Sequence, residues 1–348
     1  MTGVSGDGIV SRWFNRVRPG AASGALVVLL AAALWPAVAA ASDMPPVMSF
    51  QSENDLYGDG KDRWYTNGFR LAFAYPAGRE PALFSWIEDV LPGGPEVARS
   101  DAFFAIGQHM FTPADITRKR LLASDRPWAG WLYLEVGVSG SKGPMQETLT
   151  LSVGVTGPAS LARQTQKLVH RLTGSPQPRG WEFQLRTEPT LQLFYERAWF
   201  LKLFDLGTGA ALDVSPRLGA DLGSVFIDGN GGVVIRLGNF LPAALPPRIN
   251  PSATGAGKIL RPRSEGIGWY LFAGFEGRAV ARNLFLDGNT FARSHSVAKR
   301  TAVRELSAGV ALSFHRFALS YTFVRRSREF ALQPEGQGFG SINLSLAF

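Results

Sequence analysis

Residues 147–156 have the sequence ETLTLSVGVT, in which every second residue is large and apolar. Leu149, Leu151, Val153 and Val155 fall on one side of this segment, and threonine, serine and glycine fall on the other. An alternation with a period of two predicts a β-strand with one apolar face and one small or polar face.

The same alternation recurs along the chain and predicts an all-β protein of about twelve strands. The expected strands are Val47–Asn54, Tyr65–Tyr75, Ala102–Met110, Ala129–Ser139, Glu147–Thr156, Thr187–Phe200, Gly207–Leu218, Gly232–Leu237, Trp269–Arg282, Thr301–Ser313, Phe314–Phe323 and Gly340–Phe348. An even number suits a closed antiparallel barrel with both ends of the chain on its periplasmic side. Glycine, asparagine and proline predict turns at 228–231, 287–289 and 334–336.

Alternation alone does not separate a soluble sandwich from a membrane barrel, in which the apolar face contacts lipid and the polar face lines the lumen. Three features favour the membrane barrel. The strands have about ten residues, which is the length that crosses a bilayer when tilted. An apparent secretory signal precedes them, and the chain ends on Phe348, which resembles the signal read by the barrel assembly machinery. We therefore expect a single transmembrane antiparallel β-barrel.

The N-terminal segment predicts export. Arg12, Arg16 and Arg18 precede an apolar run over residues 21–41 that ends in small residues. This is the form of a cleaved signal peptide, expected at residues 1–42, although an uncleaved membrane anchor would have a similar apolar length. Residues 43–348 would then form the barrel in the bacterial outer membrane. Loss of three arginines and one aspartate would change the formal charge from +8 to +6, which suits an anionic lipid partner.

The composition and the absence of certain motifs exclude several kinds of catalytic and metal site. A chain with 45% hydrophobic and 18% charged residues is not disordered. The absence of cysteine excludes a thiol nucleophile and a cysteine-ligated metal, and four histidines argue against a histidine-rich metal site. The sequence also has no Gly-x-Ser-x-Gly elbow and no His-Glu-x-x-His motif. A thiol hydrolase, an ordinary serine hydrolase and a His-Glu-x-x-His zinc enzyme are therefore not expected.

The region 157–172 departs from the strand pattern and predicts one short helix, opened by Pro158. One side of this helix carries Leu161, Thr165, Leu168 and Leu172, and the other carries Arg163, Gln166 and His170. Counting connections from a periplasmic start places this helix in an extracellular loop. The connection after the first strand lies at the same rim, so His170 can approach Asn54 and Thr66.

Each of these polar residues also has an ordinary interpretation. A single histidine on a helix is usually a solvated surface residue, and Gln166 is a common helix former. Asn54 and Asp55 are residue types favoured in the turn that ends a strand. The residues by themselves leave these interpretations open.

Several segments taken together resemble the outer-membrane lipid A 3′-O-deacylase (LpxR-like) family. In chain order they are SEND (52–55), DRWYTNG (62–68), GQHMFTP (107–113), DRPWAGW (125–131), GVTGP (154–158), the stretch from Gln166 to Arg171, GWEFQL (180–185) and Glu188-Pro189. They cover roughly residues 49–200, and the C-terminal half is matched only as barrel.

The resemblance implies a twelve-stranded barrel that hydrolyses the ester of the 3′ acyloxyacyl chain of lipid A and depends on calcium. It implies that His170 is the general base and that Asn54 and Asp55 lie in the active site, where their oxygens could bind Ca²⁺. Thr66 and Gln166 match further polar site residues, and Arg118 matches a basic residue of the outer loop more loosely. An imidazole suits the role of base because its ordinary pKa is about 6.5.

The side of the first strand on which Asn54 lies indicates how the substrate would reach this site. Met48 and Phe50 belong to the expected lipid-facing set, and Asn54 has the same parity. An ester in the outer leaflet would then be approached from outside the wall and not from the lumen.

Three rival functions remain at this stage. One is a porin, which the small alanine, glycine and serine residues of the polar face disfavour, since a channel is expected to have opposed charges in its lumen. Another is a non-catalytic structural barrel, and the third is a phospholipase-like esterase. The expected partners are lipopolysaccharide and outer-membrane lipids, with no nucleic acid.

Overall fold

The computed structural model describes residues 45–81, 84, 91–207, 209–249, 258–263 and 265–348. The expected signal peptide lies outside these residues. The strands are β1 Val47–Asn54, β2 Trp64–Pro76, β3 Ala98–Thr112, β4 Ala129–Lys142, β5 Met145–Thr156, β6 Glu188–Trp199, β7 Leu201–Asp205, β8 Ala211–Gly223, β9 Phe226–Gly238, β10 Ile267–Asn283, β11 Ala302–Phe314, β12 Phe317–Arg326 and β13 Gln337–Ala347.

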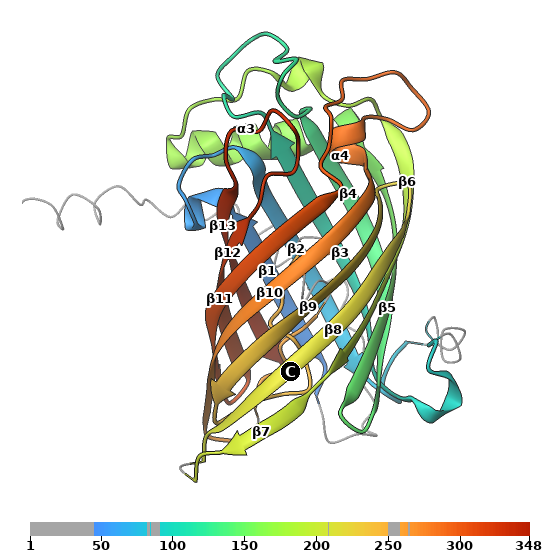
Figure 1. Cartoon of the computed structure of the whole chain (residues 1–348), viewed down its shortest axis with the longest axis vertical. Helices are drawn as coiled ribbons and strands as arrows, with labels where there is room; N and C mark the ends of the chain where they lie inside the picture. The colour runs from blue at the N-terminus through green and yellow to red at the C-terminus, as the bar shows by residue number, and fades with distance from the viewer. Residues whose placement is uncertain (1–44, 82–83, 85–90, 208, 250–257, 264) are drawn as a thin grey trace, which may run out of the picture.

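These strands form one closed antiparallel barrel (Figure 1). The last strand closes on the first, with Val47 opposite Ala347 and Asn54 opposite Gly340. β6 and β7 both pair with β8 and are two parts of one strand, separated at Phe200. The barrel therefore has twelve strands, which confirms the predicted fold class.

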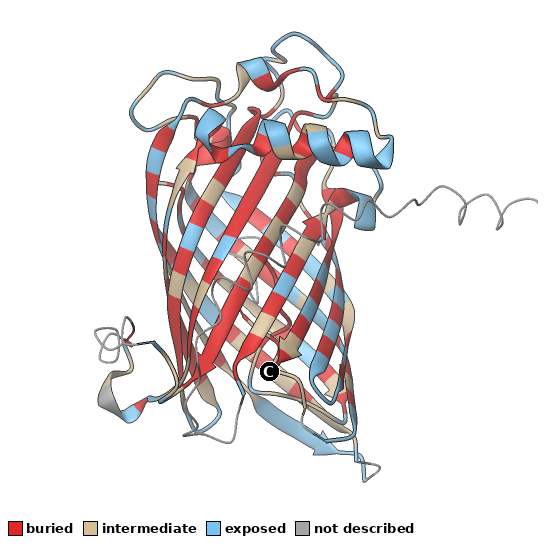
Figure 2. Ribbon diagram, turned by 180° about the vertical axis from the view of Figure 1, so that it is seen from behind, coloured by how far each residue is buried: buried red, intermediate tan, exposed pale blue. Residues whose placement is uncertain are grey.

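The outer face of the barrel is apolar. Along β12, exposed Phe317, Leu319, Tyr321 and Phe323 alternate with buried small or polar residues, and Thr322 is only 2% exposed. Figure 2 shows this alternation as bands along the strands. Such an inverted arrangement is stable when lipid covers the apolar face. Within the described residues, no helix is long and apolar enough to cross a membrane.

One predicted turn is wrong. Residues 228–231 lie inside β9, where Gly231 is opposite both Leu218 of β8 and Gly277 of β10. Turn-forming residues remain extended here because strands on both sides pair with them, which outweighs local preference. The turns predicted at 287–289 and 334–336 do lie between strands, and Gly288 has a φ of 83°.

The lumen also differs from the expectation of small residues. Buried Glu305 of β11 accepts charge-assisted hydrogen bonds from Arg326 at 2.6 Å and Arg278 at 2.7 Å. Arg248, from the connection between β9 and β10, reaches both Glu305 at 3.4 Å and Glu53 of β1 at 3.0 Å. The periplasmic connection therefore enters the barrel and helps to fill it. The two-residue alternation predicted a polar lumen but did not reveal how strongly charged it is.

The extracellular end carries the short helices. They are η1 Asp55–Tyr57, η4 Gly157–Ser160, α3 Ala162–Thr173, η5 Trp181–Phe183 and α4 Leu284–Asp287, while η3 Gly94–Glu96 lies at the other end. α3 crosses the strands at the top of the barrel (Figures 1 and 2). The predicted single helix from residue 157 is in fact a 3-10 turn, then Leu161 with a left-handed φ of 61°, then α3.

Candidate active site

The polar side of α3 faces the barrel wall. Gln166 and His170 are buried, whereas Leu161, Leu168 and Leu172 are 49%, 49% and 62% exposed. The packing is close, since a Cβ placed on Gly130 of β4 would lie 2.3 Å from Cβ of Ala162. This is the reverse of a helix on a water-soluble protein. It leaves leucines for a lipid environment and encloses polar groups between helix and wall.

His170 is held in one tautomer. It is 6% exposed, so the interpretation as a solvated surface histidine is wrong. Its Nδ1 lies 2.6 Å from the carbonyl oxygen of Pro176. Because a carbonyl only accepts hydrogen bonds, Nδ1 carries the proton and Nε2 of the neutral ring keeps its lone pair.

The partner of Nε2 is Asp62, which sequence reasoning did not assign to the site. Its Oδ2 lies 3.6 Å from Nε2, a separation that a water molecule or a substrate atom can bridge. Asp62 has a left-handed φ of 46°, a strained conformation of the kind found at functional sites. Burial raises the pKa of Asp62, and nearby His170 offsets part of that rise. The clustering of three aspartates within residues 55–62 is the feature of the sequence that could have assigned Asp62 to the site.

Asn54 and Asp55 end β1 beside this loop. Asn54 shares the outward phase of Phe50, as predicted, and its Oδ1 accepts a hydrogen bond from the backbone N–H of Leu56 at 2.7 Å. Asp55 is buried, and its Oδ2 accepts a hydrogen bond from the backbone N–H of Arg63. Its Oδ1 is buried and has no hydrogen-bond partner among the described residues. Asn54 therefore has the helix-capping role that its residue type favours, whereas Asp55 has an unsatisfied oxygen.

The electrostatics around Asp55 suit a cation. Burial raises the pKa of Asp55 well above its ordinary value, and the neighbouring Asp62 and Asp59 raise it further. Asp59 also has a buried carboxylate oxygen without a partner in the described part of the chain. Oxygen donors of this kind fit Ca²⁺. No three acidic or histidine side chains of the described residues form a complete metal site, so backbone, water or substrate oxygens would have to contribute.

Thr66 lies at a β-bulge. Pairing between β2 and β3 shifts register between Tyr65 and Asn67, so Thr66 is the extra residue. Bulges redirect side chains, and Oγ1 of Thr66 here lies 2.7 Å from Oγ1 of Thr112. The hydroxyl is buried at the extracellular end of β2, four residues after Asp62.

Gln166 occupies the helical turn before His170, on the same buried face. Its Oε1 accepts a hydrogen bond from Nε1 of Trp181 at 2.7 Å, which fixes the direction of the amide. Its Nε2 is buried and has no acceptor among the described residues. A buried, oriented and unused N–H donor is what an oxyanion requires. Trp181 is a second residue that sequence reasoning did not assign.

Arg118, unlike the other predicted site residues, lies on an exposed loop. Its side chain is 46% exposed, and Nε donates to Oδ2 of Asp115 at 2.8 Å within the same loop. The described contacts of Arg118 do not join it to Asp55, Asp62 or His170.

The family of the chain is shown by a match that extends over the whole barrel, beyond the N-terminal segments quoted above. A model of the family "Outer membrane protein LpxR" matches residues 25–348. The chain belongs to the LpxR family of outer-membrane lipid A 3′-O-deacylases. It is thus an outer-membrane ester hydrolase, as the resemblance in its N-terminal half implied.

One solved structure supports the fold. LpxR from Salmonella typhimurium is similar with a TM-score of 0.68 at 18% identity, over 87% of this chain and 100% of that one. The β domain of the Bordetella autotransporter BrkA has a TM-score of 0.44 at 9% identity, over 88% of this chain and 100% of that one. No curated protein matches the sequence significantly.

Proposed function

We propose that this protein is a calcium-dependent lipid A 3′-O-deacylase in which His170 activates water. The observation that carries the proposal is the fixed tautomer of buried His170. Its Nδ1–H is held by Pro176, so its Nε2 is left as a base beside Asp62. Family membership supports the same chemistry.

The reaction can be assigned to atoms of this chain. Nε2 of His170 takes a proton from water, and the water oxygen adds to the carbonyl carbon of the 3′ ester. The imidazolium that forms lies beside the carboxylate of Asp62, 3.6 Å away. The tetrahedral intermediate then expels the 3′ oxygen of the sugar, which takes the proton back from Nε2. The acyl chain leaves as a free acid.

Gln166 is proposed to stabilise the oxyanion. Its free Nε2–H₂ group lies on the helix face that carries His170, and Trp181 holds its other end. A donor that is already oriented gives more stabilisation than one that must reorganise during the reaction.

Calcium would be held by Asp55 through its free Oδ1, with Asn54, Asp59 and Asp62 nearby as further oxygen donors. Bound there, it would supply Lewis-acid stabilisation of negative charge on the ester oxygen. A cation would also relieve the repulsion among these buried carboxylates. Thr66 is proposed to line the same site through its hydroxyl.

Access is proposed from the lipid side of the wall. The exposed leucines of α3 give acyl chains an apolar surface directly beside the buried polar face. The charged lumen removes the earlier reason for disfavouring a porin, since opposed charges are what a channel was expected to have. Those charges are nevertheless paired across the lumen, where Arg248 from the β9–β10 connection contacts both Glu53 and Glu305.

Mass spectrometry of lipid A from cells expressing the protein tests the proposal. We expect loss of the 3′ acyloxyacyl group in the presence of calcium, and no loss with His170→Ala. His315→Asn is the matched control, since His315 lies in the turn between β11 and β12 at the far end and has a φ of 49°, which asparagine tolerates. Unchanged lipid A with folded wild-type protein would overturn the proposal, as would full activity of His170→Ala.

A further inference from the structure

A cleft of about 530 Å³ opens on the extracellular end beside the start of α3. Its walls come from α3, from the η5 region and from the connection between β10 and β11. The volume is within the range of pockets that bind small molecules. We call it the arginine cleft because Arg163, Arg186 and Arg293 line it.

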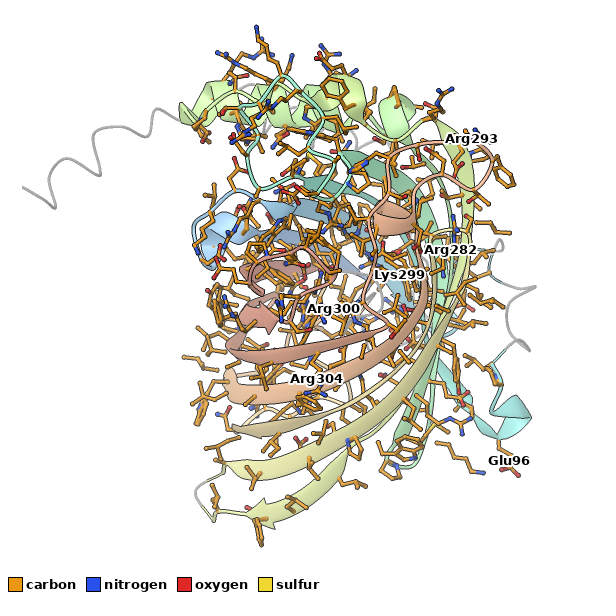
Figure 3. All side chains as sticks on the ribbon, turned by 45° about the horizontal axis from the view of Figure 1, so that its top comes forward. Glu96, Arg282, Arg293, Lys299, Arg300 and Arg304 are labelled. Carbon is orange, nitrogen blue, oxygen red and sulfur yellow. The ribbon has the colours of Figure 1, made fainter. Side chains whose placement is uncertain are left out.

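These three arginines come from three separate segments and converge on one space. All three are exposed, and no ion pair or side-chain hydrogen bond holds their guanidinium groups among the described residues. Figure 3 shows Arg293 at the extracellular rim of the barrel. Among the described residues that line the cleft, Glu182 is the only acid. Neighbouring Lys299, by contrast, is already paired with Asp287 at 2.9 Å.

The remaining lining is suited to a sugar. Partly exposed Phe183 adds aromatic surface, against which the apolar face of a pyranose ring can pack. Trp181 also lines the cleft but is only 2% exposed. His295 lies in the cleft, and its Nε2 donates to the carbonyl oxygen of Asp125 at 2.7 Å. Its Nδ1 is therefore the acceptor in the neutral ring, available to a sugar hydroxyl.

The cleft shares a wall with the candidate active site. Trp181 lines the cleft, and the same indole donates from Nε1 to Gln166 at 2.7 Å. Arg163 stands on α3 one turn before Gln166. A ligand bound in the cleft would lie beside the start of α3, with Trp181 between it and Gln166.

We propose that the arginine cleft binds a phosphorylated sugar of the oligosaccharide that is attached to lipid A, and so anchors the substrate by its glycan. Arginine is the residue best suited to phosphate, because its planar guanidinium donates two parallel hydrogen bonds. This inference rests on the proposed function for its substrate, but the site itself is separate from the ester.

Binding can be measured without catalysis. The probe is the phosphorylated core oligosaccharide released from lipopolysaccharide by mild acid, titrated calorimetrically into the full-length His170→Ala protein in detergent. A dephosphorylated sample of the same oligosaccharide and inorganic phosphate are the comparison ligands. We expect at least about tenfold weaker binding of the dephosphorylated sugar, since it loses the contacts made by charge.

The test variant is Arg163→Gln/Arg186→Gln/Arg293→Gln, and the control is Arg171→Gln/Arg179→Gln/Arg304→Gln, which removes the same charge outside the cleft. We expect the test variant alone to lose about tenfold in affinity, at one fixed ionic strength. In the active protein, the same variant should raise KM for lipopolysaccharide and leave KM for lipid A without a core unchanged.

Equal losses in the two variants, or equal binding of both oligosaccharides, would overturn the proposal. Inorganic phosphate binding as tightly as the oligosaccharide would identify a free-phosphate site and overturn substrate anchoring. Core binding without any deacylation in active protein would count against the proposed function and leave the cleft assignment standing.

Discussion

The lumen and the loop between β1 and β2 each bury a carboxylate, Glu305 and Asp55, and only Glu305 is ion-paired among the described residues. Inside the barrel, Glu305 is surrounded by three guanidinium groups, from Arg326, Arg278 and Arg248. In the loop between β1 and β2, Asp55 has no ion pair among the described residues, and one of its oxygens has no hydrogen bond there. Removing one partner of a buried ion pair is strongly destabilising, whereas an unpaired buried carboxylate either takes up a proton or binds a cation.

The strongest test of this comparison replaces the unpaired carboxylate. Asp55→Ala should lower the deacylation rate by about a thousandfold or more, because loss of a bound cation removes several kcal/mol of stabilisation from the transition state. The barrel should still show heat-modifiable migration on a gel. An Asp55→Ala protein that fails to assemble would show that Asp55 is structural like Glu305.

The lumenal counterpart should behave in the opposite way. Glu305→Gln leaves three buried arginines short of one negative charge, which we expect to cost roughly 3–5 kcal/mol of stability. The midpoint of urea unfolding should fall, while the rate per folded molecule stays unchanged. A rate loss in folded Glu305→Gln would mean that the two regions are coupled.

Replacing Gln166 tests whether its unpaired amide N–H on α3 stabilises the oxyanion. Gln166→Ala should lower kcat by about 10²–10³ with little change in KM, since the interaction would form only with the oxyanion. Trp181→Phe keeps the ring and removes only the hydrogen bond to Oε1, so its effect should be smaller and in the same direction. A change confined to KM would contradict the assignment.

Calcium affinity should depend on pH because the pKa of Asp55 is raised, chiefly by burial and then by Asp62 and Asp59. A proton competes with calcium until Asp55 ionises, so affinity should rise with pH in a range above the ordinary value of 3.8. Without calcium the same carboxyl favours the folded state at acid pH, and that contribution is lost as pH rises through its raised pKa. Calcium titrations at several pH values check the first point, and an affinity that changes only below about pH 4 would contradict it.

The smallest effect is expected at Arg118. Arg118→Ala removes an exposed ion pair with Asp115, and such pairs are worth about 0–1 kcal/mol. The rate should change by no more than a few fold, measured beside Gln166→Ala. A loss as large as that of Gln166→Ala would show that the loop brings Arg118 to the substrate.

The candidate site was only partly predictable. His170, Gln166, Asn54, Asp55 and Thr66 were expected at one rim from the strand count and the resemblance, and the structure places them there. Asp62 was not assigned because it approaches His170 only in the folded chain, from a segment more than a hundred residues away. Trp181 was not assigned because its hydrogen bond to Gln166 depends on how η5 packs against the buried side of α3. The alternation likewise gave no sign that Arg248 would enter the lumen.

The sequence alone determined the barrel, since alternation with a period of two, strands of about ten residues and an even count admit few other arrangements in a membrane. It also excluded a cysteine nucleophile, because the chain contains no cysteine. Only the tertiary structure decided which face of α3 is buried, because lipid outside the wall reverses the rule that holds in water. The tertiary structure also decided that one oxygen of Asp55 and the amide nitrogen of Gln166 are buried without hydrogen-bond partners among the described residues.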